Sequence, residues 1–317
     1  MKTVYLNKFM SSVVAELEMN GQYGTAHVCG SVLRSVMAFD GEGLPVSGIT
    51  PLWLKAYEGY LLHKGGKGLA WNTVSTYMRM LQAVYNRAVV RKLAAFIPHQ
   101  FRDVFTGRKA DHRRVLERDD MQKLLVEREP DITSPGMAWA RACLELMFRF
   151  HGMPFVDLAH LRKSDLKDGY LTLRRRKTGM PLSARVDGRA MQLLERYRNR
   201  DDTSPYLLCF LDGNLEGMAA YRDYQRILRL LNSRLRALAL WKKVQGKVTS
   251  YSARHTWATV GRYCHIPIEV ISEGLGHASV TTTEGYMKGF GNSRMDRANK
   301  VIMNYIFKGL SNAVDKW

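Results

Sequence analysis

Residues 275–286 read Leu-Gly-His-Ala-Ser-Val-Thr-Thr-Thr-Glu-Gly-Tyr, and residues 249–259 read Thr-Ser-Tyr-Ser-Ala-Arg-His-Thr-Trp-Ala-Thr. Arg254 lies 23 residues before His277, and Tyr286 follows that histidine by nine residues. Taken singly, each element is a weak signal, since a lone tyrosine usually packs and a Leu-Gly-His step usually ends a helix. Together, in this order and at these separations, they indicate one site built from an arginine, a histidine and a tyrosine.

The charge of the chain favours a polyanionic partner. Its 317 residues include 48 lysines and arginines against 29 aspartates and glutamates, which gives a formal net charge of +19. The surplus is spread out, because residues 1–110 carry +7 and the remainder carries +12. Basic side chains that neutralise phosphates release condensed counterions, so nucleic acid fits this balance. Charge alone leaves open a protein that is merely basic.

The cysteines and the apolar runs argue against two other classes of protein. Four cysteines lie far apart without a Cys-x-x-Cys pair, so we expect no disulfide framework and no zinc site. We also expect no other metal and no cofactor. No apolar run approaches the roughly 20 residues that a membrane helix needs. We therefore expect a soluble protein of the cytoplasm.

The first hundred residues are expected to form helices. Asn72 is the candidate N-cap of a helix with an apolar face at helical spacing. That face comprises Val74, Tyr77, Met78, Leu81, Val84, Tyr85 and Ala88. Basic residues in or beside this helix are candidates for DNA contact, although a solvated basic face explains this segment equally well. They are Lys64, Lys67, Arg79, Arg87, Arg91 and Lys92.

A change of composition predicts the domain boundary. Residues 101–114 are polar and basic with little apolar periodicity, which is typical of a linker. We place the linker at 106–114, between a helical domain over residues 1–105 and a second domain over residues 115–317.

The second domain is predicted to be mostly helical with one small sheet. Strand-forming residues 170–173, a turn at Lys177-Thr178-Gly179 and a return over residues 180–186 indicate a hairpin. Helical patterns cover residues 117–128, 136–150, 189–198 and 221–240. The expected fold class is mainly α with a small β-sheet.

The two C-terminal stretches resemble the signature of the tyrosine recombinases, the family of phage integrases, chromosome-dimer resolvases and site-specific invertases. That signature has an arginine in His-x-x-Arg-His, a Leu-Gly-His element and a tyrosine nine residues after its histidine. Residues 152–159, Gly-Met-Pro-Phe-Val-Asp-Leu-Ala, and the Lys-Thr-Gly turn are similar to elements of integrases from mobile elements of Bacteroides-like bacteria. The resemblance covers roughly 115–305. It is looser over residues 1–105, where only a helical, SAM-like core-binding domain of suitable size and charge matches.

The resemblance implies DNA strand transfer without metal or ATP. Tyr286 would attack a backbone phosphate and form a 3′-phosphotyrosyl ester. Arg254 would grip two phosphate oxygens, and His277 would hold or donate to one. Lys177, on a turn that can reach into the minor groove, would be the general acid. Asp157 would orient its neighbours.

Three arginines precede Lys177, so its assignment rests on the turn. Of these, Arg175 and Arg176 are candidate DNA contacts. His255, beside Arg254, belongs to the signature and is as well suited to packing as to binding.

Two positions depart from the family pattern. Pro154 stands where the family has its first catalytic arginine, in Gly-x-Arg. We hypothesise that Arg149 or His151 supplies the missing cation. Tyr251 stands where His-x-x-Arg has histidine, and its hydroxyl can donate one hydrogen bond without a positive charge at neutral pH.

The resemblance further implies a C-shaped clamp on double-stranded DNA. It also implies a homotetramer around two specific recombination sites, and it allows a monomer when the protein is not bound to DNA. The setting would be bacterial, with the protein at the nucleoid when bound and no membrane association. Integration, excision and inversion all remain open. Residues 295–307 have the apolar spacing of a helix that packs on a neighbouring protomer or on its own core. A catalytically weakened DNA-binding protein and a type IB topoisomerase-like nicking-closing enzyme are the alternatives.

Overall fold

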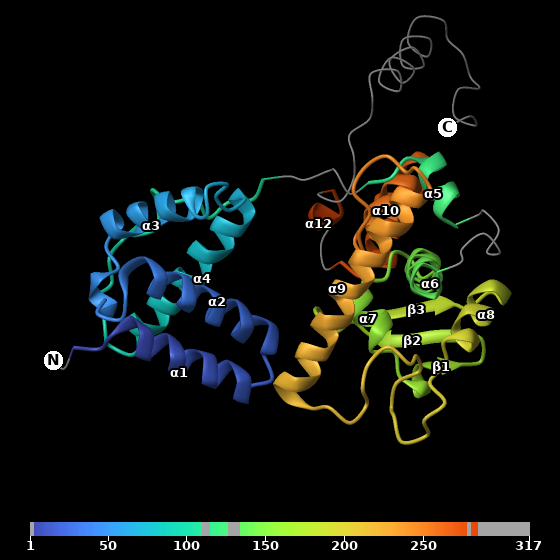
Figure 1. The fold of residues 1–317 in the computed structure, drawn as a ribbon, viewed down its shortest axis with the longest axis horizontal. Coiled ribbons are helices and arrows are strands. Elements are labelled where there is room, and N and C mark those ends of the chain that lie inside the picture. Colours follow the sequence, from blue (N-terminus) through green and yellow to red (C-terminus); the bar gives the residue numbers. More distant parts are fainter. Residues whose placement is uncertain (1–2, 110–114, 126–133, 278–279, 285–317) are drawn as a thin grey trace, which may run out of the picture. The chain divides into compact units, whose positions relative to one another are not determined.

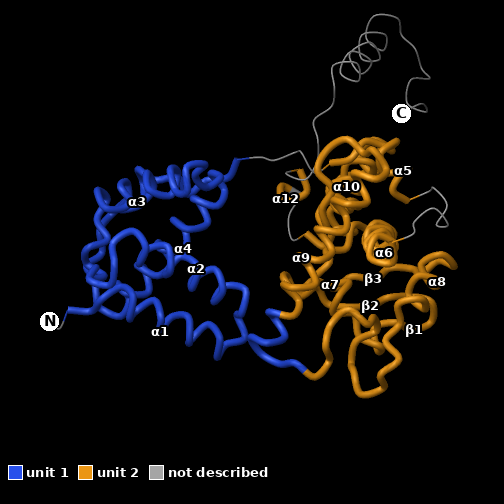
Figure 2. The backbone as a smooth tube through the Cα atoms, viewed as in Figure 1, with its two compact units in different colours: residues 1–110, 215–222 blue, residues 111–214, 223–317 orange. Residues whose placement is uncertain are grey.

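The computed structural model describes residues 3–109, 115–125, 134–277 and 280–284. The chain divides into two compact units, coloured separately in Figure 2. Unit 1 comprises Met1–Ala110 with Leu215–Arg222, and unit 2 comprises Asp111–Asn214 with Asp223–Trp317. Each unit has its own hydrophobic core. In the described ranges no helix is long and apolar enough to cross a membrane.

Unit 1 is helical (Figure 1). Its helices are α1 (Leu6–Met19), α2 (Tyr23–Asp40), the short 3-10 helix η1 (Val46–Gly48), α3 (Pro51–His63) and α4 (Trp71–Val90). The predicted apolar face of α4 is confirmed, with the tyrosine at position 77 only partly buried. This face packs into a core with the apolar residues of α1, α2 and α3, which fixes the four helices as one body.

The N-cap predicted at Asn72 is wrong. Helix α4 begins one residue earlier, at Trp71, with Ala70 as its N-cap. Asn72 therefore lies in the first turn, where its side chain is free to bind elsewhere. Its amide donates to the carbonyl of Lys109 and accepts from the backbone N–H of the same residue, both at 2.8 Å.

The segment after α4 packs onto unit 1 as far as residue 109. Phe101 and Val104 are buried in the core, and the Ser75 hydroxyl donates to the carbonyl of Gly107 at 2.6 Å. The backbone N–H of Phe105 donates to Glu58, whose carboxylate is buried. Only residues 110–114 of the predicted linker fall outside the described ranges.

Unit 2 combines helices with a three-stranded sheet. Its helices are α5 (Arg118–Leu125), α6 (Pro135–Arg149), α7 (Phe155–Ala159), α8 (Gly188–Arg196), most of α9 (Gly217–Trp241), α10 (Ser252–Tyr263), α11 (Ile268–Leu275) and α12 (Val280–Glu284), with the 3-10 helix η3 (Lys163–Asp165). Four of the predicted helical patterns thus correspond to α5, α6, α8 and α9. Residues 126–128 and 295–307, also predicted as helical, lie outside the described residues.

The strands lie side by side in the order β1 (Leu166–Lys167), β2 (Tyr170–Arg174) and β3 (Pro181–Arg185), all antiparallel (Figure 1). Along β2 and β3 the buried residues alternate with exposed ones, so one face of the hairpin packs on the core. The predicted hairpin is confirmed; β1 has only two residues and carried no sequence signal. The chain is mainly α with a small β-sheet, as expected.

Candidate active site

The loop after α6 makes a close approach to Arg254. Gly152 has a φ of +67°, and a Cβ added there would lie 2.9 Å from the Cα of Arg254. Glycine is needed for both reasons, because other residues rarely adopt this φ and none would fit the gap. The carbonyl of Gly152 accepts a 3.0 Å hydrogen bond from Nη1 of Arg254. The glycine thus anchors the candidate arginine to the end of α6.

Arg254 lies in the first turn of α10 and is 3% exposed. Besides Gly152, its guanidinium holds the carbonyl of Leu275, to which Nη2 donates at 2.6 Å. Nη2 also donates to Nε2 of His277 at 2.7 Å. Since α6, α10 and α11 all converge on this one side chain, Arg254 is rigidly oriented.

His277 is held on both ring nitrogens. An arginine is only a donor, so Nε2 of His277 accepts from Arg254, and Nδ1 must carry the proton. Nδ1–H donates to the hydroxyl of Thr283 in α12, 2.8 Å away. Burial, and then the charges of Arg254 and Arg175, lower the pKa of His277 to about 4. The histidine is therefore neutral near pH 7.

Gly276 ends helix α11 in the left-handed conformation, with a φ of +61°. This C-cap lets the chain turn from Leu275 directly to His277. A Cβ at Gly276 would lie 2.6 Å from Cδ and 2.8 Å from Nη1 of Arg175. The Leu-Gly-His element therefore packs its glycine backbone against the end of strand β2.

Asp157 is buried in α7 and holds the base of the hairpin tip. One carboxylate oxygen accepts from Nε of Arg175 at 3.1 Å, and the other accepts from the backbone N–H of Arg176 at 2.9 Å. Arg175 is itself 6% exposed, so this is a buried ion pair. The expectation that Asp157 orients its neighbours agrees with these contacts.

Lys177 lies at the exposed tip of the β2–β3 hairpin. The tip is closed by backbone hydrogen bonds from Arg175 to Met180 and from Gly179 to Arg175, at 2.9 and 2.8 Å. Arg176 is also exposed, whereas Arg175 points into the protein. Of the two arginines predicted to contact DNA here, only Arg176 has the exposure of an ordinary surface contact.

Arg149 and His151 bring no uncommitted positive charge to the cluster. Nε of Arg149 lies 3.0 Å from Glu145 Oε1, and Nη1 lies 2.6 Å from Asp187 Oδ2, at the N-cap of α8. His151 packs its ring 5.6 Å from that of Trp257, and burial lowers its pKa. These contacts argue against either residue as the missing cation.

Tyr251 is exposed one residue before α10, and its ring is 6.2 Å from that of His255, which is half-buried. Tyr251 lies three residues before Arg254. Tyr286, the predicted nucleophile, lies outside the described residues.

The basic residues predicted to contact DNA from unit 1 are divided between free and paired positions. Lys67, Arg79 and Lys92 are exposed. Arg91 is also exposed, but it and Arg87 pair with Glu16 of α1 at 2.6 and 3.5 Å. Lys64 is half-buried beside the ring of Tyr60.

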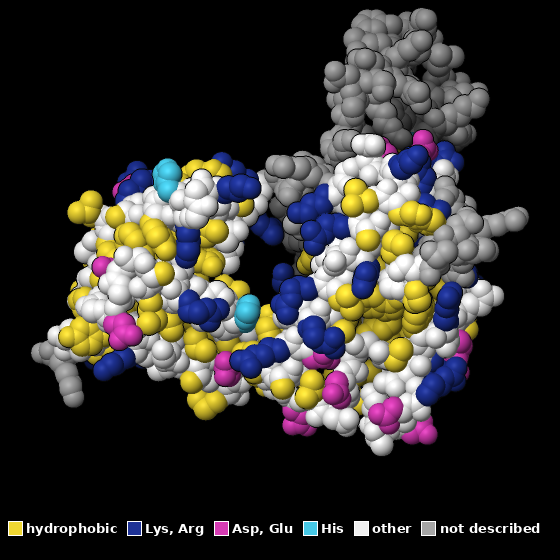
Figure 3. Space-filling view, in the orientation of Figure 1, with side chains coloured by type: hydrophobic (Ala, Val, Ile, Leu, Met, Phe, Trp, Pro, Cys, Tyr) yellow, Lys and Arg dark blue, Asp and Glu magenta, His cyan; other side chains and the backbone are white. Residues whose placement is uncertain are grey.

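A basic stripe on α9 was not predicted from the sequence. Lysine and arginine side chains gather on unit 2 where this helix runs (Figure 3). Arg226, Arg229 and Arg236 are exposed at helical spacing, opposite the buried Leu231 and Leu235. The spacing was readable in the sequence once the helix was placed. Thr283 was missed as well, and no local pattern marked it.

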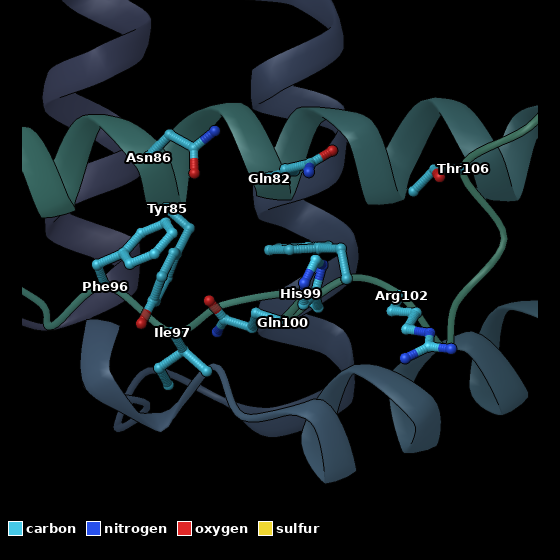
Figure 4. A pocket seen from close by; sticks show the side chains of 10 residues that line it. Gln82, Tyr85, Asn86, Phe96, Ile97, His99, Gln100, Arg102 and Thr106 are labelled. Atoms are coloured by element: carbon cyan, nitrogen blue, oxygen red, sulfur yellow. The ribbon is translucent and has the colours of Figure 1, made fainter.

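A pocket of about 440 Å³ lies in unit 1 (Figure 4). Gln82 and Asn86 line it from α4, and Phe96, His99 and Arg102 line it from the following segment. None of the residues predicted from the sequence to bind or react lines this pocket.

Two family models match this chain. The family model described as "Phage integrase SAM-like domain" matches residues 5–102, and that described as "Phage integrase family" matches residues 114–290. Tyrosine recombinase XerA of Pyrococcus furiosus is 29% identical over 140 residues, which cover 43% of this chain and 46% of that protein. The putative integrase/recombinase y4gC of Sinorhizobium fredii is 27% identical over 180 residues, covering 55% of this chain and 88% of that protein. The match thus spans less than half the length of the archaeal relative.

Solved structures share the fold. A lambda integrase fragment, solved as a dimer bound to a core site, has a TM-score of 0.65 at 18% identity, covering 91% of this chain and 97% of the fragment. A lambda integrase tetramer bound to a Holliday junction has a TM-score of 0.60 at 16% identity, covering 90% and 78%.

Proposed function

Because this chain belongs to the phage integrase family, whose model matches residues 114–290, we propose that it is a site-specific DNA recombinase of the tyrosine type. In this proposal it cuts and rejoins DNA for integration, excision or inversion, without metal or ATP. The observation that carries the proposal is the cluster in which Arg254 meets His277, the residue nine positions before the predicted nucleophile.

The reaction exchanges one ester for another. The Tyr286 oxygen bonds to the scissile phosphorus, the bond to the 5′ oxygen breaks, and the phenolic proton is in effect transferred to that leaving oxygen. The product is a 3′-phosphotyrosyl ester with a free 5′-hydroxyl, and the reverse reaction rejoins the strand. Because the bond energy is kept in the ester, ligation needs no ATP.

The other residues stabilise charge and move the proton. Arg254, permanently charged and fixed by two backbone carbonyls, would bind non-bridging phosphate oxygens. Lys177, exposed on the hairpin tip, would protonate the 5′ oxygen as general acid. Tyr251 would donate one hydrogen bond to phosphate, and His277 would hold or donate to another oxygen.

DNA contact would extend over both units. We propose residues 1–105 as the core-binding domain, 106–114 as the linker and 115–317 as the catalytic domain, closing as a clamp on the duplex. The exposed Lys67, Arg79 and Arg176 are supporting contacts. The partner would be double-stranded DNA with specific sites. By analogy with the tetramer of lambda integrase, four protomers would assemble around two sites.

The finer assignment is to integrases of Bacteroides-type mobile elements, acting in the bacterial cytoplasm. Its support is the Gly-Met-Pro-Phe-Val-Asp-Leu-Ala element over residues 152–159 and the Lys-Thr-Gly turn. Sequencing the DNA beside the gene for inverted repeats would test this setting and supply candidate sites.

The test of function is covalent capture of DNA. Protein is incubated with supercoiled plasmids that carry or lack the DNA flanking its gene, and denaturant-resistant adducts are collected. We expect adducts that require the flanking DNA, that disappear in Tyr286→Phe and that form more slowly in Tyr251→Phe. DNA binding without adducts would instead favour a catalytically weakened binding protein, for which Pro154 is the specific support. Relaxation of both plasmids alike would favour a topoisomerase-like enzyme.

A further inference from the structure

The proposed chemistry needs more positive charge than the two central residues supply. A pentacoordinate phosphate carries up to two negative charges on its non-bridging oxygens, and fixed cations lower the barrier by neutralising them. Arg254 brings one positive charge. His277, with its pKa lowered to about 4, is neutral near pH 7. Pro154, at the start of α7, brings none. A second fixed cation beside Arg254 would complete the site.

Arg175 is a guanidinium with an unused end. Its Nε is paired with the buried Asp157 at 3.1 Å. Its Nη1 is also buried, and within the described part of the chain no acceptor lies within hydrogen-bonding distance of that nitrogen. A buried donor without an acceptor is energetically costly, so such groups are uncommon in folded proteins. A buried donor that has no acceptor within the protein is suited to bind a ligand that supplies one.

The unused end points toward the catalytic cluster. Nη1 of Arg175 would be 2.8 Å from a Cβ at Gly276, the residue directly before His277. The positive charge of Arg175 also contributes to the lowered pKa of His277. Arg254 contacts the same corner of the fold through the carbonyl of Leu275 and through His277. Two guanidiniums therefore flank the Leu-Gly-His element.

Among the described residues of unit 2, a further buried arginine, Arg141, has a structural role. Arg141 donates to the carbonyls of Leu124 and Leu125 at 2.9 and 2.6 Å, at the end of α5. Arg149 is paired with two carboxylates, and Lys177 lies exposed on the hairpin tip.

We propose that Arg175 is a catalytic residue that binds a non-bridging oxygen of the scissile phosphate through Nη1, as the second guanidinium of the site. Asp157 is then its positioning residue, because it holds Nε and so fixes the direction of the fork. Gly276 provides the space through which Nη1 reaches the phosphate. This role depends on the recombinase function proposed above.

The experiment measures adduct formation on the plasmid that carries the flanking DNA. Arg175→Lys keeps a positive charge beside Asp157 but has no second nitrogen to extend to the phosphate. We expect this variant to melt within a few degrees of wild type and to bind the plasmid DNA within about threefold, since it loses one phosphate contact among many. Adducts should form 10²- to 10³-fold more slowly, which is the loss seen when one transition-state donor is removed. Arg149→Lys is the matched control and should form adducts within about threefold of wild type.

A second readout tests the chemical role of Arg175. Once the cleaved phosphate has been mapped with wild-type protein, it is replaced by a neutral methylphosphonate, which removes the charge from one non-bridging oxygen. On this substrate we expect the defect of Arg175→Lys to fall below tenfold, while that of Lys177→Ala persists. If folded Arg175→Lys forms adducts at the wild-type rate, or if the methylphosphonate leaves its defect unchanged, the proposal for Arg175 is overturned and the recombinase function stands. An absence of adducts with wild-type protein would overturn the proposed function and with it this role.

Discussion

Nη2 of Arg254 donates a 2.7 Å hydrogen bond to Nε2 of His277, so the two side chains at the centre of the site bind each other. The bond gives the histidine a definite tautomer, with its acceptor toward the arginine and its proton toward Thr283. A phosphate oxygen that is to receive a proton or hydrogen bond from Nε2 must first displace Arg254 from that nitrogen. Phosphate binding is therefore coupled to a change in the protonation or the partner of His277.

The pKa of His277 should be directly measurable. In histidine-labelled protein, its ring resonances should titrate with a midpoint near 4, because burial and the charges of Arg254 and Arg175 disfavour the imidazolium. Arg254→Gln should move the midpoint upward, toward the ordinary value near 6.5, because it removes one of those charges. A midpoint near 6.5 in the unaltered protein would contradict the claim that burial and the neighbouring arginines lower the pKa of His277.

Thr283→Val should slow adduct formation about fivefold to tenfold. The substitution removes the acceptor for Nδ1–H of His277, and a single hydrogen bond contributes about 1 kcal/mol. Thr283→Ser is the matched control, because it keeps the hydroxyl, and should retain most of the rate. Equal rates for the valine and serine variants would show that the tautomer is set by other contacts.

Acid should destabilise the catalytic unit through two partly buried histidines. The pKa of His160, like that of His277, is lowered to about 4, mainly by burial. A histidine whose pKa is lower in the folded state than the unfolded value of about 6.5 binds more protons when unfolded. Stability is therefore full above pH 6.5 and is lost as the pH falls toward 4, by on the order of 1–3 kcal/mol for each histidine.

Urea unfolding of wild type and His160→Gln at pH 7.0, 5.5 and 4.5 would measure this loss. The glutamine variant is expected to be less stable at pH 7, because it loses the ring packing against Tyr206 and Tyr224. Its stability should nevertheless fall less between pH 7.0 and 4.5. Parallel pH dependences in the two proteins would assign the effect to other groups.

Gly276→Ala should be more damaging than its backbone conformation alone explains. A left-handed φ costs a residue with a Cβ roughly 1–2 kcal/mol. At Gly276 the added carbon would also lie 2.6 Å from Cδ of Arg175, so the arginine or α11 must move. We expect a loss of stability of about 2–4 kcal/mol and a large drop in adduct formation.

Gly169→Ala separates these two effects. Gly169 has a φ of +76° in the same unit, and a Cβ there would meet nothing within 4 Å. This variant should lose only the backbone contribution and keep its activity. If the two alanine variants had equal thermal unfolding midpoints and equal activities, the space beside Gly276 would not be needed for the placement of Arg175.

Much of the fold was predictable because its signals are local. The apolar period of α4 and the Lys-Thr-Gly turn between two short strands each fix an element from a few neighbouring residues. The approach of Arg254 to His277 was predicted by the family resemblance, although their bond was not. The N-cap prediction at Asn72 was wrong because it rested on the local preference of asparagine for helix N-caps. The actual partner of its side chain, Lys109, is 37 residues away.

The position of Arg175 could not be predicted in the same way. In the sequence it is the middle of three arginines before a lysine, which is typical of a solvated basic surface. It is buried because its partner Asp157 lies in α7 and Gly276 leaves space beside it. Neither relationship appears in any window of neighbouring residues. Arg149 was proposed as a substitute from its position shortly before Pro154; of its two carboxylate partners Glu145 is local, but Asp187 is distant in sequence.

The attachment of the hairpin through Asp157 has a consequence for motion. The carboxylate fixes Arg175 and the backbone of Arg176, whereas residues 177–180 beyond it are exposed. Amide exchange should therefore be slow at Arg176 and faster at the exposed tip, apart from Gly179, whose N–H donates to the carbonyl of Arg175. The tip should reorient on the nanosecond timescale of surface turns. Lys177 would then reach the 5′ oxygen through local motion of residues 177–180. The Lys177 side chain would reach the leaving oxygen in a step separate from the binding of the phosphate.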